Sequence, residues 1–147
     1  MKTVAWLKTT RRVFLDTAPI IYFVEKHPHY FQVVRPIFES IDAGKLKPVT
    51  SPITLAECLV HPYRMGHLDV VKTFSNLLIK QMYFVQVDEI IASRAAELRA
   101  RHNLGLPDAF QFAVALNAGC DAFLTNDSAL KRVAELKVIV LNELMEI

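Results

Sequence analysis

Short apolar runs alternate with helical patterns along the whole chain, and this alternation restricts its fold more than any other feature. The runs are continuously apolar, which is typical of strands that helices cover on both faces. Strand–helix–strand order favours right-handed crossovers and parallel strands. We therefore predict one α/β domain over residues 1–147, with a central, mainly parallel sheet flanked by helices. The predicted strands are Arg12–Leu15, Lys47–Thr50, Met82–Val87, Ala122–Thr125 and Val138–Leu141.

Helical patterns fill the segments between and around these strands. Pro36 lies inside one of them and predicts a kink or a split, because proline removes a helical hydrogen bond. The predicted helices are Pro19–Glu25, Phe31–Ala43, Pro52–Arg64, His67–Lys80, Asp88–His102, Pro107–Ala118 and Ser128–Ala134.

Composition narrows the class of protein. Hydrophobic residues make up 52% of the chain, so we expect an exposed apolar patch and hence a dimer or a protein partner. No apolar run reaches the roughly 18 residues of a membrane helix, and Lys8 interrupts any signal-peptide core, so we expect a cytoplasmic protein. The net charge of +2 is too small to indicate nucleic-acid binding by itself. Cys58 and Cys120 lie in apolar segments and are predicted to be core residues.

Acidic residues recur where the predicted strands end or the next helices begin. Because ligands of open parallel sheets bind beyond the carboxyl ends of the strands, these positions are the candidate site. Asp16 ends the first strand, and Glu57 lies one turn into the helix after the second strand. Asp108 follows Pro107 at a helix start, and Asp127 follows the strand of "AFLT".

Three of these acids also have a purely structural interpretation, which the sequence leaves open. Asp16 or Thr17 could cap the helix ahead of Pro19, since both residue types accept hydrogen bonds from the first amides. Asp108 could complement a helix dipole, and Asp127 could form a turn and a cap.

Glu57 is different, because its helix face is largely apolar and no Lys or Arg lies three or four residues away. A carboxylate in such a setting needs a distant partner or a ligand. Asp88 also stands between a strand and a helix, but we predict a helix N-cap there. Asp121 precedes its strand, so it should lie on the opposite edge of the sheet.

Converging carboxylates repel one another unless a cation compensates. Sites made only of carboxylates suit Mg²⁺ or Mn²⁺ rather than zinc. Such ions lower the pKa of bound water and offset charge at a phosphoryl centre, so the pattern points to phosphodiester or phosphate hydrolysis. No histidine pair has the helical spacing of a zinc protease. An aspartyl-phosphate mechanism would want a second acid where Ala18 stands.

Three stretches together resemble the PIN-domain family, close to its VapC-type toxins. They are "VFLDTAPIIYF", "TSPITLAECLV" and "LPDAFQFAVALNAGCDAFLTND", and with the closing strand they span nearly the whole chain. The resemblance implies a metal-dependent ribonuclease that uses Mg²⁺ or Mn²⁺ on an RNA substrate, forms a homodimer and pairs with a VapB-type antitoxin. It implies metal-binding and catalytic roles for Asp16, Glu57, Asp108 and Asp127, with Thr17, Thr125 and Asn126 in support.

Two departures from the family pattern stand out. Leu104 and Gly105 precede the "LPD" motif, where the family often has a basic residue. The segment before the first strand is also longer than a minimal domain requires, and its role is not evident. Candidate contacts to RNA phosphates are Arg11, Arg12, Arg64, Arg99 and Arg101. The rival interpretation is a non-catalytic PIN-like module that binds RNA or protein, although a decayed site should have lost an acid and none is missing.

Overall fold

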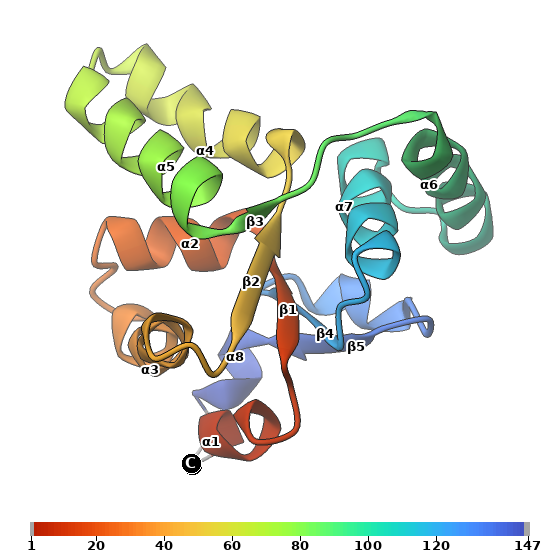
Figure 1. Ribbon diagram of the computed structural model, residues 1–147, viewed down its shortest axis with the longest axis horizontal. Coiled ribbons are helices and arrows are strands. Elements are labelled where there is room, and N and C mark those ends of the chain that lie inside the picture. Colours follow the sequence, from red (N-terminus) through yellow and green to blue (C-terminus); the bar gives the residue numbers. More distant parts are fainter. Residues whose placement is uncertain (1, 146–147) are drawn as a thin grey trace.

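Five parallel strands form a single sheet in the part of the chain that the structure describes (Figure 1). The structure is a computed structural model that describes residues 2–145, with side chains from residue 5 onward. The strand order is β3-β2-β1-β4-β5, so β1 occupies the centre. The strands are β1 (Arg12–Leu15), β2 (Lys47–Thr50), β3 (Tyr83–Phe84), β4 (Ala122–Thr125) and β5 (Lys137–Val140). The prediction of a parallel α/β sheet is confirmed.

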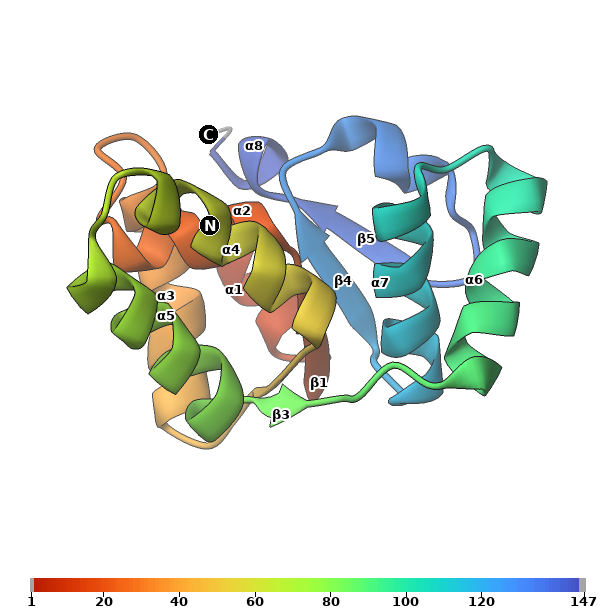
Figure 2. The same cartoon turned by 90° about the horizontal axis from the view of Figure 1, so that it is seen from above.

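Helices cover both faces of this sheet, as Figures 1 and 2 show. Each strand sends alternate side chains to opposite faces. Val13 and Leu15 enter one core with α1–α5 and α8, whereas Phe14 enters a second core with α6 and α7. The helices are α1 (Lys2–Leu7), α2 (Thr17–Val24), α3 (Phe31–Asp42), α4 (Pro52–Arg64), α5 (Leu68–Gln81), α6 (Glu89–His102), α7 (Leu106–Asn117) and α8 (Leu141–Leu144), with a 3₁₀ helix η1 (Ser128–Arg132).

Aromatic rings join α7 to the centre of the sheet. Phe123 of β4 stacks on Phe112 of α7 at a centroid distance of 4.0 Å and on Phe14 of β1 at 5.1 Å. All three side chains are fully buried. Stacked aromatic pairs add about 0.5–1.5 kcal/mol to the area that they bury. This contact fixes α7, and with it the start of α7, relative to the ends of β1 and β4.

The register of the parallel strands brings their carboxyl ends to one edge. Leu15 of β1 lies opposite Leu124 of β4, and Phe14 lies opposite Val49 of β2. Residues that immediately follow β1, β2 and β4 are therefore neighbours in space. The α2 and α4 helices begin at this edge, at Thr17 and Pro52.

Several predicted boundaries were wrong. The strand predicted at Met82–Val87 is only Tyr83–Phe84, because it pairs with β2 alone at the edge of the sheet. Pro36 does not split α3, which is continuous from Phe31 to Asp42. The predicted helix Ser128–Ala134 is the shorter 3₁₀ helix η1. Leu141 belongs to α8 rather than to the last strand, and α8 was not predicted.

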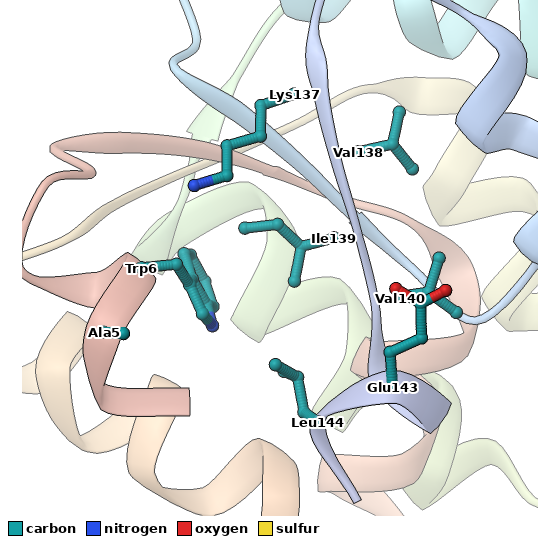
Figure 3. A pocket seen from close by; sticks show the side chains of 8 residues that line it. All are labelled: Ala5, Trp6, Lys137, Val138, Ile139, Val140, Glu143 and Leu144. Carbon is teal, nitrogen blue, oxygen red and sulfur yellow. The ribbon is translucent and has the colours of Figure 1, made fainter. Parts of the chain in front are cut away.

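The segment before β1 contributes to the first core. It forms α1, also unpredicted, whose Trp6 is only 5% exposed and packs in the cluster that contains Val13 and Ile139. The Thr10 hydroxyl donates a hydrogen bond of 2.7 Å to the Trp6 carbonyl and so ends the helix. Figure 3 shows Trp6 across a pocket from the edge strand β5 and from α8. This segment therefore covers apolar surface of the core.

Both cysteines lie in the apolar interior of the protein. Cys58 and Cys120 are free and buried, one in each core, as predicted. Burial raises the pKa of both thiols to about 12, so they are inert at neutral pH. Among the described residues, no helix combines the length and apolarity that crossing a membrane requires.

Candidate functional site

Asp16 stands at the centre of the carboxyl edge, directly after β1. It is the N-cap of α2, and its Oδ1 accepts a hydrogen bond of 2.8 Å from the Thr17 amide. Its Oδ2 accepts a hydrogen bond of 2.7 Å from the buried Thr125 hydroxyl, at the end of β4. Burial raises the pKa of Asp16, and the nearby charge of Glu57 raises it further, against the opposing effect of these hydrogen bonds. Asp16 therefore caps the helix, and it is also a carboxylate that two hydrogen bonds orient and that the charge of Glu57 repels.

Glu57 of α4 faces Asp16 across the start of α2. Its Oε1 accepts a hydrogen bond of 2.7 Å from the Thr17 hydroxyl and one of 3.3 Å from the Gln111 side-chain amide. Glu57 is exposed on α4, so these two neutral donors orient the carboxylate rather than compensate for its burial. Thr17 links the two acids, since its amide binds Asp16 and its hydroxyl binds Glu57.

Asp108 lies in the first turn of α7, but it does not cap that helix. The N-cap is Gly105, and no side chain caps the helix start. Burial raises the pKa of Asp108 to about 6, and the charges of Asp16, Asp127 and Glu57 add to this effect. The guanidinium of Arg132 opposes it only weakly. The ionised form of Asp108 therefore destabilises the folded protein, and no capping hydrogen bond at the start of α7 offsets this cost.

Asp127 completes the set of four acids that the sequence singled out. It is exposed, and its Oδ1 accepts a hydrogen bond of 3.0 Å from the Ala129 amide at the start of η1. Its own amide donates to the Thr125 hydroxyl, which in turn donates to Asp16. The expected capping role is present, and the charge of Asp127 also acts on Asp108.

Asn126 acts as a link rather than as part of the carboxylate cluster. Its side-chain amide donates to the Tyr22 hydroxyl at 3.2 Å, and its side-chain oxygen accepts from the Asn142 amide at 2.9 Å. Tyr30 donates to the Asn142 side chain and stacks on Tyr22. Asn126 therefore ties the end of β4 to α2 and α8, and this holds Thr125 and Asp127 in place.

The two acids set aside in the sequence lie where they were expected. Asp88 is the N-cap of α6 and accepts a hydrogen bond of 2.9 Å from the Ile91 amide. Asp121 lies at the opposite edge of the sheet, where it accepts hydrogen bonds from the Arg11 and Arg12 amides. These bonds lower the pKa of Asp121. Neither acid joins the cluster.

The arginines proposed to bind RNA have other surroundings. Arg11 and Arg12 lie at the opposite edge beside Asp121, and Arg12 donates a hydrogen bond of 2.6 Å to the Ala118 carbonyl. Arg99 donates to the Leu104 carbonyl, and Arg101 pairs with Glu135. Arg11 and Arg12 therefore lie away from the carboxyl edge, whereas Arg99 lies beside the start of α7, and contacts to RNA phosphates stay a prediction.

Arg64 is exposed at the end of α4, about 10 Å along the helix from Glu57. The cation that acts on the acid cluster is Arg132, which the sequence did not suggest. Its guanidinium binds the carbonyls of His102, Asn103 and Ala129 and so secures the end of α6.

Gln111 is the second residue that sequence reasoning missed. It lies on α7, three residues after Asp108, and is fully buried beside Glu57 and Thr54. The available signal was a lone polar side chain in the apolar stretch "AFQFAVAL" of that helix. A buried polar group in such a stretch needs partners, and Thr54 and Glu57 provide them.

The donor set fits a hard divalent cation. Within residues 2–145, no three acidic, histidine or cysteine side chains are already gathered tightly enough to hold an ion. The four acids nevertheless offer only oxygen atoms, and none of them takes part in an ion pair in the described part of the chain. Their mutual repulsion is the imbalance that Mg²⁺ or Mn²⁺ would relieve.

Comparison with known proteins identifies the family of the chain and supports its fold. The sequence model of the family described as "PIN domain" matches residues 13–136, which is most of the chain. The chain belongs to the PIN-domain family. A search of curated proteins finds no match to this PIN domain. The matched region excludes α1, and it also ends before β5.

Solved structures show the same fold at low sequence identity. The VapBC2 complex of Rickettsia felis, bound to a promoter DNA fragment, has 16% identity and a TM-score of 0.69, covering 88% of this chain and 98% of that chain. DNA-bound VapBC from Salmonella typhimurium has 18% identity and a TM-score of 0.68, covering 89% and 98%. Mycobacterium tuberculosis VapC20, a toxin that cleaves the sarcin–ricin loop, has 18% identity and a TM-score of 0.63, covering 76% and 86%.

Proposed function

We propose that this PIN domain is a VapC-like toxin that cleaves RNA phosphodiester bonds with the help of Mg²⁺ or Mn²⁺. One observation supports the proposal most directly. Four carboxylates from separate segments oppose one another at the carboxyl edge of the sheet, and the pKa of Asp108 is raised to about 6 there. Strongly perturbed carboxylates in such a place are typical of functional sites. VapC20, which shares the fold, cleaves RNA.

Each acid has a distinct role in this proposal. Asp16, Glu57 and Asp108 would hold and orient the principal ion, and Asp127 would complete that site or a second one. A bound Mg²⁺ or Mn²⁺ would supply charge neutralisation at the phosphoryl group and a more acidic water molecule. The protein supplies positioning, which is a large part of catalysis in such sites.

The hydroxyl groups of the site orient the carboxylates. Thr125 donates to Asp16, and Thr17 donates to Glu57, each at 2.7 Å. One oxygen of each acid is thereby fixed, and the carboxylates cannot rotate freely. Asn126 maintains this arrangement from behind through Tyr22 and the Asn142 amide. These residues are positioning residues, and we assign none of them a direct contact with RNA.

Protein partners follow from the same comparison. The relatives from R. felis and S. typhimurium are toxin–antitoxin complexes on DNA, so we infer a VapB-type antitoxin as the partner of this chain. Large apolar side chains are exposed around the turn between α4 and α5, and they support association with a second protein or a second copy. They are Val60, Tyr63, Met65 and Leu68. Light scattering of the purified protein would distinguish the proposed homodimer from a monomer.

The test is RNA cleavage by the Asp16→Asn variant in Mg²⁺ or Mn²⁺. We expect a loss of about 10²-fold or more, because the substitution removes the central charge of the site while it keeps the shape. Asp121→Asn is the matched control, since Asp121 lies at the opposite edge of the same sheet. Undiminished cleavage by a folded Asp16→Asn protein would refute the assignment. No cleavage by the wild type, with no Mn²⁺ binding, would instead favour the non-catalytic module.

A further inference from the structure

Gln111 is a fully buried amide in the apolar middle of α7. Its neighbours along the helix, Phe112, Ala113, Val114 and Ala115, are all completely buried. Burying an amide without full hydrogen bonding is unfavourable in proteins. An apolar side chain would pack here at no such cost. The glutamine is therefore placed against a local energetic preference.

The amide is only partly satisfied. Its Nε2 donates to the Thr54 hydroxyl at 3.1 Å and to Glu57 Oε1 at 3.3 Å. Its Oε1 is buried and has no hydrogen-bond partner among the described residues. Because a carboxylate oxygen only accepts hydrogen bonds, the NH₂ group must face Glu57. The benefit of Gln111 thus lies in its NH₂ group, and the unpartnered Oε1 is the cost of that orientation.

The NH₂ group of Gln111 and the Thr17 hydroxyl meet on the same oxygen of Glu57. Thr17 comes from the start of α2 and Gln111 from α7, while Glu57 itself belongs to α4. Within the described part of the chain, no side chain donates a hydrogen bond to the other oxygen, Oε2. A glutamate side chain has three rotatable bonds, and two donors on one oxygen restrict them. The second oxygen is then left without a side-chain donor in the described part of the chain.

We propose that Gln111 is a positioning residue that clamps Glu57 Oε1 together with Thr17 and so presents Oε2 to a divalent cation. This inference rests on the proposed function, because the clamp matters only if Glu57 binds the ion. Residues behind a metal ligand typically change metal affinity or activity by about 10–100-fold when they are replaced. Gln111 occupies that position for Glu57.

The competing structural explanation is that Gln111 only joins α7 to α4 through Thr54. Two matched variants separate the explanations. Gln111→Met keeps the length and volume of the side chain but removes both hydrogen bonds of Nε2. Thr54→Val keeps the shape of Thr54 and removes only the bond to Gln111. If Gln111 were only a structural link, the two variants would change the Mn²⁺ affinity equally. If it is a clamp, only Gln111→Met weakens Mn²⁺ binding.

The experiment is titration of the purified full chain with Mn²⁺ alone, with free Mn²⁺ measured by electron paramagnetic resonance. We expect Gln111→Met to bind Mn²⁺ about 10–100-fold more weakly than the wild type, and Thr54→Val to bind it equally well. In a Glu57→Gln background, Gln111→Met should have a clearly smaller effect, since the residue acts mainly through Glu57, although its amide also reaches Asp16. Thr17→Val removes the other donor to Oε1 and should also weaken binding.

Each other result overturns a defined part of the reasoning. Wild-type affinity in folded Gln111→Met, equal losses in Gln111→Met and Thr54→Val, or an undiminished loss in the Glu57→Gln background would each overturn the clamp. If Gln111→Met does not fold, Thr17→Val carries the test, because Thr17 is only partly buried, and unchanged affinity there overturns the clamp. Absence of Mn²⁺ binding by the wild type would overturn the proposed metal dependence itself. Binding that Asp16→Asn abolishes but Gln111→Met leaves intact would overturn the clamp alone.

Discussion

Replacing Asp108 with asparagine should stabilise the protein in the absence of divalent ions. The folded state raises the pKa of this carboxyl from an ordinary 3.8 to about 6, mainly through burial and then through the charges of Asp16, Asp127 and Glu57. The ionised form is thus disfavoured in the folded protein. Asparagine keeps the shape and removes the charge, so the repulsion disappears.

The size of the effect follows from the change in pKa. The difference between 3.8 and about 6, at 1.36 kcal/mol for each pH unit, sets an upper bound of about 3 kcal/mol. Asp108 is only partly buried, and water screens part of the repulsion. We therefore expect a gain of about 1–2 kcal/mol in the free energy of unfolding at pH 7.5.

The sign of the pH dependence is specific. Below about pH 3.8 the carboxyl is protonated in both the folded and the unfolded state, so its charge costs nothing. As the pH rises through the window from 3.8 to about 6, the unfolded chain loses its proton first, and the folded state becomes less stable. Above about pH 6 the full cost is present. The advantage of Asp108→Asn should therefore grow between pH 4 and pH 7 and then level off.

Urea unfolding followed by circular dichroism, in EDTA and at several pH values, measures this difference directly. Asp121→Asn is a control of opposite sign, because hydrogen bonds from the Arg11 and Arg12 amides lower the pKa of Asp121. That variant should be less stable than the wild type near neutral pH, with the difference vanishing in acid. An Asp108→Asn protein that is no more stable than the wild type at pH 7.5 would refute the argument from repulsion.

Two further measurements address the ion and the segment before β1. A saturating concentration of Mn²⁺, at 100 times its dissociation constant, should raise the free energy of unfolding of the wild type by about 2.7 kcal/mol. Thermal unfolding with and without Mn²⁺ measures this rise, and the Asp16→Asn variant should show none. Trp6→Ala should cost about 3–5 kcal/mol, because Trp6 is only 5% exposed in the first core. A loss below about 1 kcal/mol in urea unfolding would mean that α1 is a dispensable addition.

The central strands could be predicted from the sequence because burial on both faces leaves a plain signal. Val13, Phe14 and Leu15 are all fully buried, and an uninterrupted apolar run is typical of such surroundings. The edge strand β3 has no such requirement, since Tyr83 is 47% exposed. Its length depends on how far β2 continues to pair with it, which is a tertiary property.

Charged residues could be predicted only as far as the topology places them. The acids at strand ends were found because a parallel sheet brings its carboxyl ends together. The partners of the arginines were not, because a long side chain can reach several carbonyl oxygens: Arg12 binds that of Ala118, and Arg99 binds that of Leu104. Gln111 was missed because a helix pattern does not reveal which neighbour its buried amide contacts.

Capping and catalysis were treated as alternatives in the sequence, yet the geometry makes them compatible. A helix that follows a parallel strand begins at the carboxyl edge, so its cap can also belong to the site, as Asp16 does, although Asp88 at the start of α6 does not. Asp16 and Asp127 each accept a hydrogen bond from a first-turn amide and also act on the charge of Asp108. Asp108 itself has no capping bond to account for it. Asp108 is therefore the acid that capping explains least. The energetic cost of its negative charge is the strongest indication that the site binds a ligand.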